Sequence, residues 1–188
     1  MKKLAAGLML IVTLALSACG ILSNASAAGR DGSCPAPSGD MEAYRSEEHG
    51  YCMLYPSSYT VTQFEGGNIR IEAEPVGFPH PLPPFASVEV TDAADRSVEQ
   101  VADELTADFQ GPAADFIIER EPATLGGEQA IVLDQMPGQD LSRQVIAVHE
   151  GRLYRLTFVT ADETLPEYEG MQEIYDAVMA SFTFTPAE

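Results

Sequence analysis

The chain has 188 residues and a formal net charge of −19, because 29 acidic residues face only ten basic ones. A surface this acidic repels nucleic acid and anionic lipid, so neither is expected as an electrostatic partner. The length suits one domain once a leader and a tether are subtracted.

The N-terminus has the pattern of an export signal. Lys2 and Lys3 precede an apolar stretch of thirteen residues, 4–16, and residues 16–19 read Leu-Ser-Ala-Cys. A permanent membrane helix needs about 20 apolar residues, so the stretch is too short to span a bilayer. The pattern resembles bacterial lipoprotein signal peptides. That resemblance implies a signal peptide over 1–18 and an acylated Cys19 as the mature N-terminus, lipid-anchored on the extracytoplasmic side of a bacterial membrane.

An alternative export route stays open. Cleavage after Ala25-Ser26-Ala27 would release a soluble protein without Cys19. We favour the lipobox because it adjoins the apolar stretch directly, whereas the second site lies further along the chain. On either route Lys2 and Lys3 are lost. With the lipobox, eight arginines face 29 acidic residues, which gives a mature charge of −21.

Residues 19–43 have the composition of a flexible tether, and residues 44–188 are expected to form the domain. Cys34 and Cys52 are the remaining cysteines. In an oxidising compartment they are the available pair for a disulfide, although two free thiols remain the alternative. Without a C-x-x-C spacing, such a bridge would be structural.

The first half of the domain shows the period of β-strands. Strands are predicted over 51–55, 59–64, 68–74 and 86–91, with turn residues between them. In the third of these, Ile69 and Ile71 alternate with Arg70 and Glu72, which indicates a half-buried strand.

Between residues 75 and 84 the prolines prevent a regular strand and favour an open, extended loop. We name Phe78, His80, Leu82 and Phe85 as the candidate partner-binding residues of this region, since prolines lower the entropy cost of ordering a loop. The alternative is that Phe78 and Phe85 fold over the sheet as a lid on the core.

Two helices are predicted. Ser97 with Gln100 forms a capping box that opens the first, and Thr164 with Glu167 forms another that opens the second. The apolar stripe of the first helix is Val98, Val101, Ala102, Leu105 and Phe109, and that of the second is Tyr168, Met171, Tyr175 and Val178. Further strands are expected over 116–120, 129–134, 141–150, 153–160 and 181–185. Mostly sequential strands joined by short turns predict an α+β fold, with an antiparallel β-sheet flanked by helices.

The domain resembles the PsbP-like α/β/α sandwich family, which includes LpqN-like lipoproteins, over residues 44–185. The resemblance rests on residues 51–59 (YCMLYPSSY), on Gly126-Gly127 before a strand, on 151–158 (GRLYRLTF) and on 179–184 (MASFTF). Tyr59 stands where many relatives have Trp, and residues 75–84 match no family pattern. The resemblance implies a role in binding or assembly and transfers no catalytic residue.

No motif assigns an activity. His49, His80 and His149 are scattered and lack a nucleophile or metal motif around them, so no catalytic residue is named. The acidic sets Asp92, Asp95, Glu99 and Asp162, Glu163, Glu167 lack the spacing of a calcium loop and are expected to serve turns and helix N-termini. No metal and no cofactor is predicted.

The sequence therefore predicts a non-enzymatic, lipid-anchored domain that binds a protein partner or assists the assembly of an envelope complex. A lipoprotein that binds a small ligand or a cation is the alternative. An uncharacterised hydrolase that uses His149 is the third hypothesis.

Overall fold

A computed structural model describes residues 32–73, 81–109 and 117–187 of the chain. The signal peptide, Cys19 and the tether up to residue 31 lie outside the described residues, as do Phe78 and His80.

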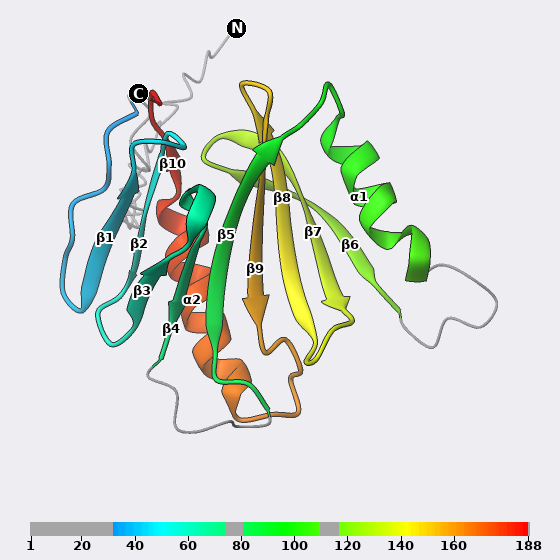
Figure 1. Ribbon diagram of the computed structural model, residues 1–188. Helices are drawn as coiled ribbons and strands as arrows, with labels where there is room; N and C mark the ends of the chain where they lie inside the picture. Colours follow the sequence, from blue (N-terminus) through cyan, green and yellow to red (C-terminus); the bar gives the residue numbers. More distant parts are fainter. Residues whose placement is uncertain (1–31, 74–80, 110–116, 188) are drawn as a thin grey trace, which may run out of the picture.

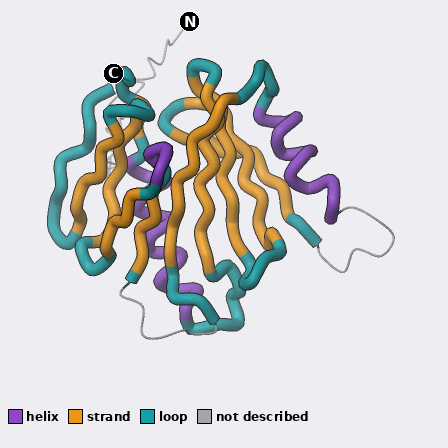
Figure 2. Tube along the Cα trace, viewed as in Figure 1, coloured by secondary structure: helices purple, strands orange, loops and turns teal. Residues whose placement is uncertain are grey.

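Ten strands and two α-helices make up the described chain (Figures 1 and 2). The strands are β1 (Met41–Ser46), β2 (Tyr51–Pro56), β3 (Thr60–Gln63), β4 (Ile69–Glu72), β5 (Phe85–Asp92), β6 (Glu119–Leu125), β7 (Glu128–Met136), β8 (Ser142–His149), β9 (Arg152–Val159) and β10 (Thr183–Phe184). The helices are α1 (Val98–Thr106) and α2 (Glu167–Ser181), with short 3₁₀ turns η1 (Glu65–Gly67) and η2 (Ala107–Phe109).

The strands form two antiparallel sheets. A seven-stranded sheet has the order β3-β4-β5-β9-β8-β7-β6, and a three-stranded sheet has the order β1-β2-β10. In Figure 1, α2 lies behind the large sheet, whereas α1 lies beside β6, β7 and β8. The predicted α+β class with an antiparallel sheet and flanking helices is confirmed. Within the described ranges, neither helix has the length and apolar character to cross a bilayer.

Two cores lie on opposite faces of the large sheet. The larger one packs α2 and β2 against the sheet, with Tyr51, Leu156 and Met171 fully buried. Within it, the rings of Tyr51 and Phe182 stack with centroids 5.3 Å apart. The smaller core packs α1 on β7 and β8 through Val101. Because side chains alternate along a strand, β7 and β8 contribute residues to the cores on both faces of the sheet.

The start of the domain differs from the prediction. Residues 19–43 were expected to be tether, but β1 begins at Met41 and pairs with β2 along its whole length. Five of the six β1 residues are partly or fully exposed, and only Ser46 is buried, so the strand carries a weak apolar pattern. The prediction of tether up to residue 43 is therefore wrong at its C-terminal end.

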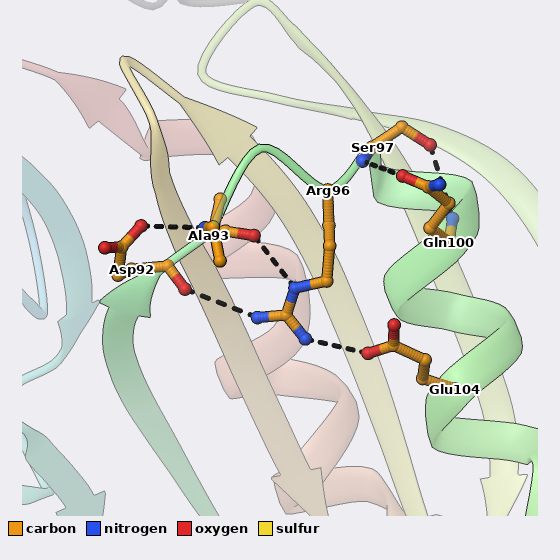
Figure 3. A network of polar contacts seen from close by, with 7 residues as sticks. Asp92, Ala93, Arg96, Ser97, Gln100 and Glu104 are labelled. Carbon is orange, nitrogen blue, oxygen red and sulfur yellow. Dashed lines mark hydrogen bonds and ion pairs between the residues drawn. The ribbon is translucent and has the colours of Figure 1, made fainter.

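The helix α1 begins as predicted. The backbone N–H of Gln100 donates to Ser97 Oγ at 3.3 Å, and the Ser97 N–H donates to Gln100 Oε1 at 2.8 Å (Figure 3). Arg96 continues the network, since its guanidinium bonds to the carbonyl of Ala93 and to Glu104 in the last turn of the helix. These contacts fix the angle between β5 and α1.

The second capping box does not form. Pro166 is the N-cap of α2 and makes no side-chain cap, and the hydroxyl of Thr164 donates to Asp162 instead. An Asp side chain two residues before a threonine closes a local turn, and this turn competes with the cap.

A disulfide joins Cys34 to Cys52, with the Cα atoms 5.7 Å apart. It lies near the turn between β1 and β2. At this turn the side chain of Arg152, which begins β9, donates to the carbonyl of Glu48 at 2.9 Å. The turn between β8 and β9 therefore lies at the same end of the molecule. We call this end of the molecule the disulfide end. The opposite end, where β5 begins and β9 ends, is called the distal end. Strands β5 and β9 run between the two ends and have eight residues each, which span about 25 Å.

Candidate functional site

The predicted partner-binding segment enters the structure at the distal end. Phe78 and His80 lie outside the described residues, but Leu82 is placed and is held by its backbone. Its N–H donates to Asp140 Oδ2 at 2.8 Å, and its carbonyl accepts from Thr160 Oγ1 at 3.0 Å. Leu82 is thus attached to the loop between β7 and β8 and to the end of β9.

Phe85 is the first residue of β5, and it is half-buried outside both cores. The guanidinium of Arg70 lies 3.7 Å from the centroid of its ring, and Arg70 Nε is 2.8 Å from a carboxylate oxygen of Glu72. The arginine covers the ring on the sheet face opposite α2. Phe85 therefore packs against Arg70 and lies outside both cores, so it does not form a lid on the core.

An open cleft of about 610 Å³ lies at the distal end, and we call it the distal cleft. Four segments line it: Ile117 before β6 with Glu119 at its start, Asp134 and Gln135 at the end of β7, Leu141 before β8, and Asp162, Glu163 and Thr164 before α2. Leu141 directly follows Asp140, which holds Leu82, so the cleft and the predicted binding segment share one loop.

A bulge in β7 shapes the floor of the distal cleft. The pairing of β7 with β8 shifts register between Leu133 and Met136, and Gln135 adopts a left-handed backbone with φ of 61°. The Gln135 side-chain amide donates to the carbonyl of Ala161 at 2.9 Å, and the Ala161 N–H donates to the carbonyl of Leu141 at 2.8 Å. These bonds join three lining segments into one rigid support.

Asp134 is the one cleft carboxylate with an arginine partner among the described residues. Arg143 lies 2.5 Å from its Oδ2, donates to Gln172 on α2 and stacks on the ring of Tyr175 at 4.8 Å. Burial by itself lowers the pKa of Arg143, but the hydrogen bond and charge of Asp134 outweigh it and hold that pKa above its ordinary value. The guanidinium of Arg143 therefore binds Asp134 and residues of α2.

The other three carboxylates of the distal cleft keep their charge uncompensated. Glu119, Asp162 and Glu163 have no ion pair with any arginine of the described ranges. The hydroxyl and N–H of Thr164 donate to Asp162 at 2.7 and 2.9 Å, and these bonds lower the pKa of Asp162. Asp162 therefore remains ionised near neutral pH.

One wall of the distal cleft is apolar and open to solvent. Ile117 is 83% exposed, and within the described chain only Phe64 is another large hydrophobic residue of this kind, at 54%. Leu141 lines the same cleft and is half-buried. The cleft thus presents aliphatic surface beside negative charge.

The described histidines serve structural contacts. His149 Nδ1 lies 2.8 Å from Glu128 Oε1, and its ring stacks on Phe184 with centroids 4.1 Å apart. His49 Nε2 lies 2.7 Å from the carbonyl oxygen of Gly66. Both rings therefore join turns or strands at the disulfide end.

The acidic sets considered as cation ligands serve turns and a helix start. Asp92 Oδ1 accepts from the N–H of Ala94 at 2.7 Å, and Glu99 lies in the first turn of α1. A hydrogen bond from its own backbone N–H, followed by one from Ser97, lowers the pKa of Glu99. Over residues 32–73, 81–109 and 117–187, no three acidic, histidine or cysteine side chains are grouped as a metal site.

Sequence reasoning selected Leu82 but missed the distal cleft. Ile117 falls in the stretch 116–120, which was predicted as a strand, whereas β6 begins only at Glu119. Because the lining residues come from four separate segments, no local pattern joins them. The available signal was the acidic stretch at Asp162 and Glu163, which the sequence interpretation assigned to a turn.

Comparison with known proteins gives a fold and no family. No protein-family model matches the chain, and no curated protein matches its sequence. The solution structure of cyanobacterial PsbP (CyanoP) from Synechocystis sp. PCC 6803 matches with a TM-score of 0.51 and 16% identity, over 83% of this chain and 99% of that one.

Two crystal structures show related likeness. A protein from Bacteroides thetaiotaomicron VPI-5482 gives a TM-score of 0.53 at 12% identity, over 77% of this chain and 48% of that chain. LpqN of Mycobacterium tuberculosis, described as involved in cell envelope biogenesis, gives 0.48 at 17% identity, over 79% and 93% of the two chains. The match to CyanoP confirms the predicted PsbP-like fold, and identities this low show the fold alone.

Proposed function

We propose that this protein is a lipid-anchored, extracytoplasmic, non-enzymatic domain that binds a protein partner, or helps to assemble an envelope complex, through its distal end. The anchor in this proposal is Cys19, which ends the lipobox Leu16-Ser17-Ala18-Cys19. The mature charge of −21 supports a covalent attachment, because anionic headgroups would repel the domain itself.

The polarity of the fold is the observation that carries the proposal. The disulfide holds the chain at Cys34 to one end of the sheet, and Leu82 and the distal cleft lie about 25 Å away at the other end. The 15 residues from Cys19 to residue 33 would give a flexible tether with a root-mean-square span of about 20 Å. A domain tethered in this way presents its distal end away from the membrane.

The contacts of the two described histidines, His49 and His149, favour a binding role over catalysis. His149 is occupied by Glu128 and Phe184, and the ring of His49 bonds to a backbone carbonyl. In contrast, the distal end combines an open cleft, exposed aliphatic surface and charge, which are features of a docking site.

The anchor is tested by cell fractionation. We expect the wild-type chain in the membrane fraction and Cys19→Ala in the soluble extracytoplasmic fraction, because the acyl chains are the attachment. Ser17→Gly is the matched control, since it keeps a small residue within the lipobox and should remain membrane-bound. Recovery of Cys19→Ala with the membranes at wild-type level would refute the anchor.

The binding end is tested by photo-crosslinking of the lipid-anchored chain in the cells that produce it. A photoreactive residue replaces Gln139, which is exposed in the loop between β7 and β8, or Phe64 at the disulfide end. We expect a discrete protein adduct from position 139 and none from position 64. Adducts from position 64 alone, or from neither position, would contradict binding through the distal end.

A further inference from the structure

We infer that the distal cleft receives a basic, partly aliphatic segment of the partner, with an arginine or lysine side chain as its central contact. This inference rests on the proposed function and specifies the partner's chemistry at the same site. It follows from three properties of the cleft: its exposed apolar wall, its uncompensated charge and the rigidity of its floor.

The apolar wall of the distal cleft favours an organic ligand over a hydrated metal ion. Ile117 is 83% exposed, and Leu141 lines the same cleft of about 610 Å³. A hydrated cation gains nothing from aliphatic surface, and the described residues provide no three-ligand metal group. A side chain with methylene groups gains free energy by covering both residues.

The charge of the distal cleft selects a cation. Glu119, Asp162 and Glu163 carry no arginine partner within the described chain, and Arg143 is held by Asp134, Gln172 and the ring of Tyr175. An anionic or phosphorylated ligand would meet like charge both from Glu119 and from Asp162 with Glu163. A cationic ligand meets complementary charge, which steers association and sets the orientation.

Arginine and lysine combine the two requirements. Their methylene stems lie along apolar surface while the charged head reaches carboxylates or water. Ile117 and Leu141 would contact the stem, and Glu119 and Glu163 would contact the head. Since Gln135, Ala161 and Leu141 are joined by hydrogen bonds, the floor is ordered before the partner binds.

The inference is tested by peptide binding. The peptide is a fluorescent hexapeptide with blocked ends, Ala-Leu-Arg-Ala-Leu-Arg, and the protein is the mature chain with its lipid, solubilised in detergent. Fluorescence anisotropy measures Kd at low ionic strength. We expect the basic peptide to bind, and its charge-reversed twin with Glu in place of Arg to bind at least about tenfold more weakly. Raising the salt concentration should weaken the binding of the basic peptide, because salt screens the attraction between exposed charges.

Variants locate the binding in the distal cleft. Glu119→Gln with Glu163→Gln is expected to raise Kd about fivefold, since each exposed ion pair contributes modestly. Ile117→Ser is expected to raise Kd by a similar factor through lost apolar contact. The matched controls are Glu47→Gln with Glu104→Gln, and Phe64→Ser, which change exposed residues elsewhere and should leave Kd within about twofold.

Two results would overturn the inference: equal binding of the two peptides, or a Kd that the cleft variants leave unchanged. Absence of binding by the basic peptide up to millimolar concentration would overturn it as well. In each of these cases an adduct from position 139 in cells would leave the proposed function standing. Conversely, peptide binding that the cleft variants weaken, without any adduct in cells, would support the cleft chemistry and contradict the proposed function.

Discussion

Opening the disulfide is expected to lower the free energy of unfolding by about 3 kcal/mol. The bridge between Cys34 and Cys52 closes a loop with a sequence separation of 18. In the chain-entropy treatment, a closed loop of this length restricts the unfolded ensemble by about 3 kcal/mol at 25 °C. We expect the fold to survive its loss, because many residues besides Cys52 pack the two cores.

The assay compares three forms of a chain that carries Cys19→Ala, so that no lipid and no third thiol is present. Urea unfolding is followed for the oxidised chain, for the same chain in reducing agent, and for Cys34→Ser with Cys52→Ala. Alanine is chosen at position 52 because the Cys52 side chain is fully buried, and a hydroxyl there would need a partner. The reduced chain keeps both sulfur atoms and isolates the effect of the crosslink.

We expect the oxidised chain to exceed the reduced chain by about 3 kcal/mol, and the double variant to lie within about 1 kcal/mol of the reduced chain. Equal unfolding midpoints of the oxidised and reduced chains would refute the reasoning. Free thiols at Cys34 and Cys52 in the oxidised native protein, detected by a thiol reagent, would show that the bridge does not form.

Three further predictions concern the core, the first helix and a buried tyrosine. Leu156→Ala should lower the free energy of unfolding by about 3 kcal/mol, because Leu156 is fully buried and the change leaves a cavity; urea unfolding measures it. Ser97→Ala should lower it by about 1 kcal/mol by removing one half of the capping box, as measured in the same way. Burial, followed by the carboxylate of Glu42, raises the pKa of Tyr55 to about 12 from 10.0. The folded state holds this proton more tightly than the unfolded state, so stability should be constant below pH 10 and fall between about pH 10 and 12. Tyr55→Phe should reduce that fall, measured as the urea midpoint against pH.

Each of these has a control or a contrary outcome. Ile117→Ala, at an exposed position, should change the free energy of unfolding by less than about 0.5 kcal/mol. Thr164→Ala should cost less than Ser97→Ala, since Thr164 does not cap α2. A pH profile that is identical for wild type and Tyr55→Phe would show that Tyr55 does not contribute to alkaline destabilisation.

Local signals predicted the elements that local contacts determine. The alternation at Ile69 and Ile71 correctly predicted strand β4, and the capping-box pair Ser97 and Gln100 correctly predicted where α1 begins. The strand β6 was misplaced because its sequence is polar, contains Pro122 and takes its register from pairing with β7 across the turn at Gly126-Gly127. Likewise, β1 is defined by its partner β2 more than by its own apolar pattern.

The distal cleft is a tertiary feature and could not be read from one segment. It requires the bulge at Gln135, which follows from strand pairing, and the approach of the loop before α2 to the start of β6. The position of Phe85 was equally hidden, because the arginine that covers it belongs to a neighbouring strand. Charge, by contrast, is visible in the sequence, and it excluded nucleic acid and anionic lipid as electrostatic partners without indicating where a partner binds.

The placement of the last strand beside the second one has a consequence for how the chain folds. The N–H of Leu54 donates to Ser181 Oγ across 127 positions, and Phe182 stacks on Tyr51 inside the larger core. Contacts of such long sequence separation slow folding, because chain closure must precede them. A chain that is synthesised from its N-terminus therefore cannot complete this core until residues 181 and 182 are available. Until then β2 and the sheet expose apolar surface, which makes the incomplete chain prone to aggregation.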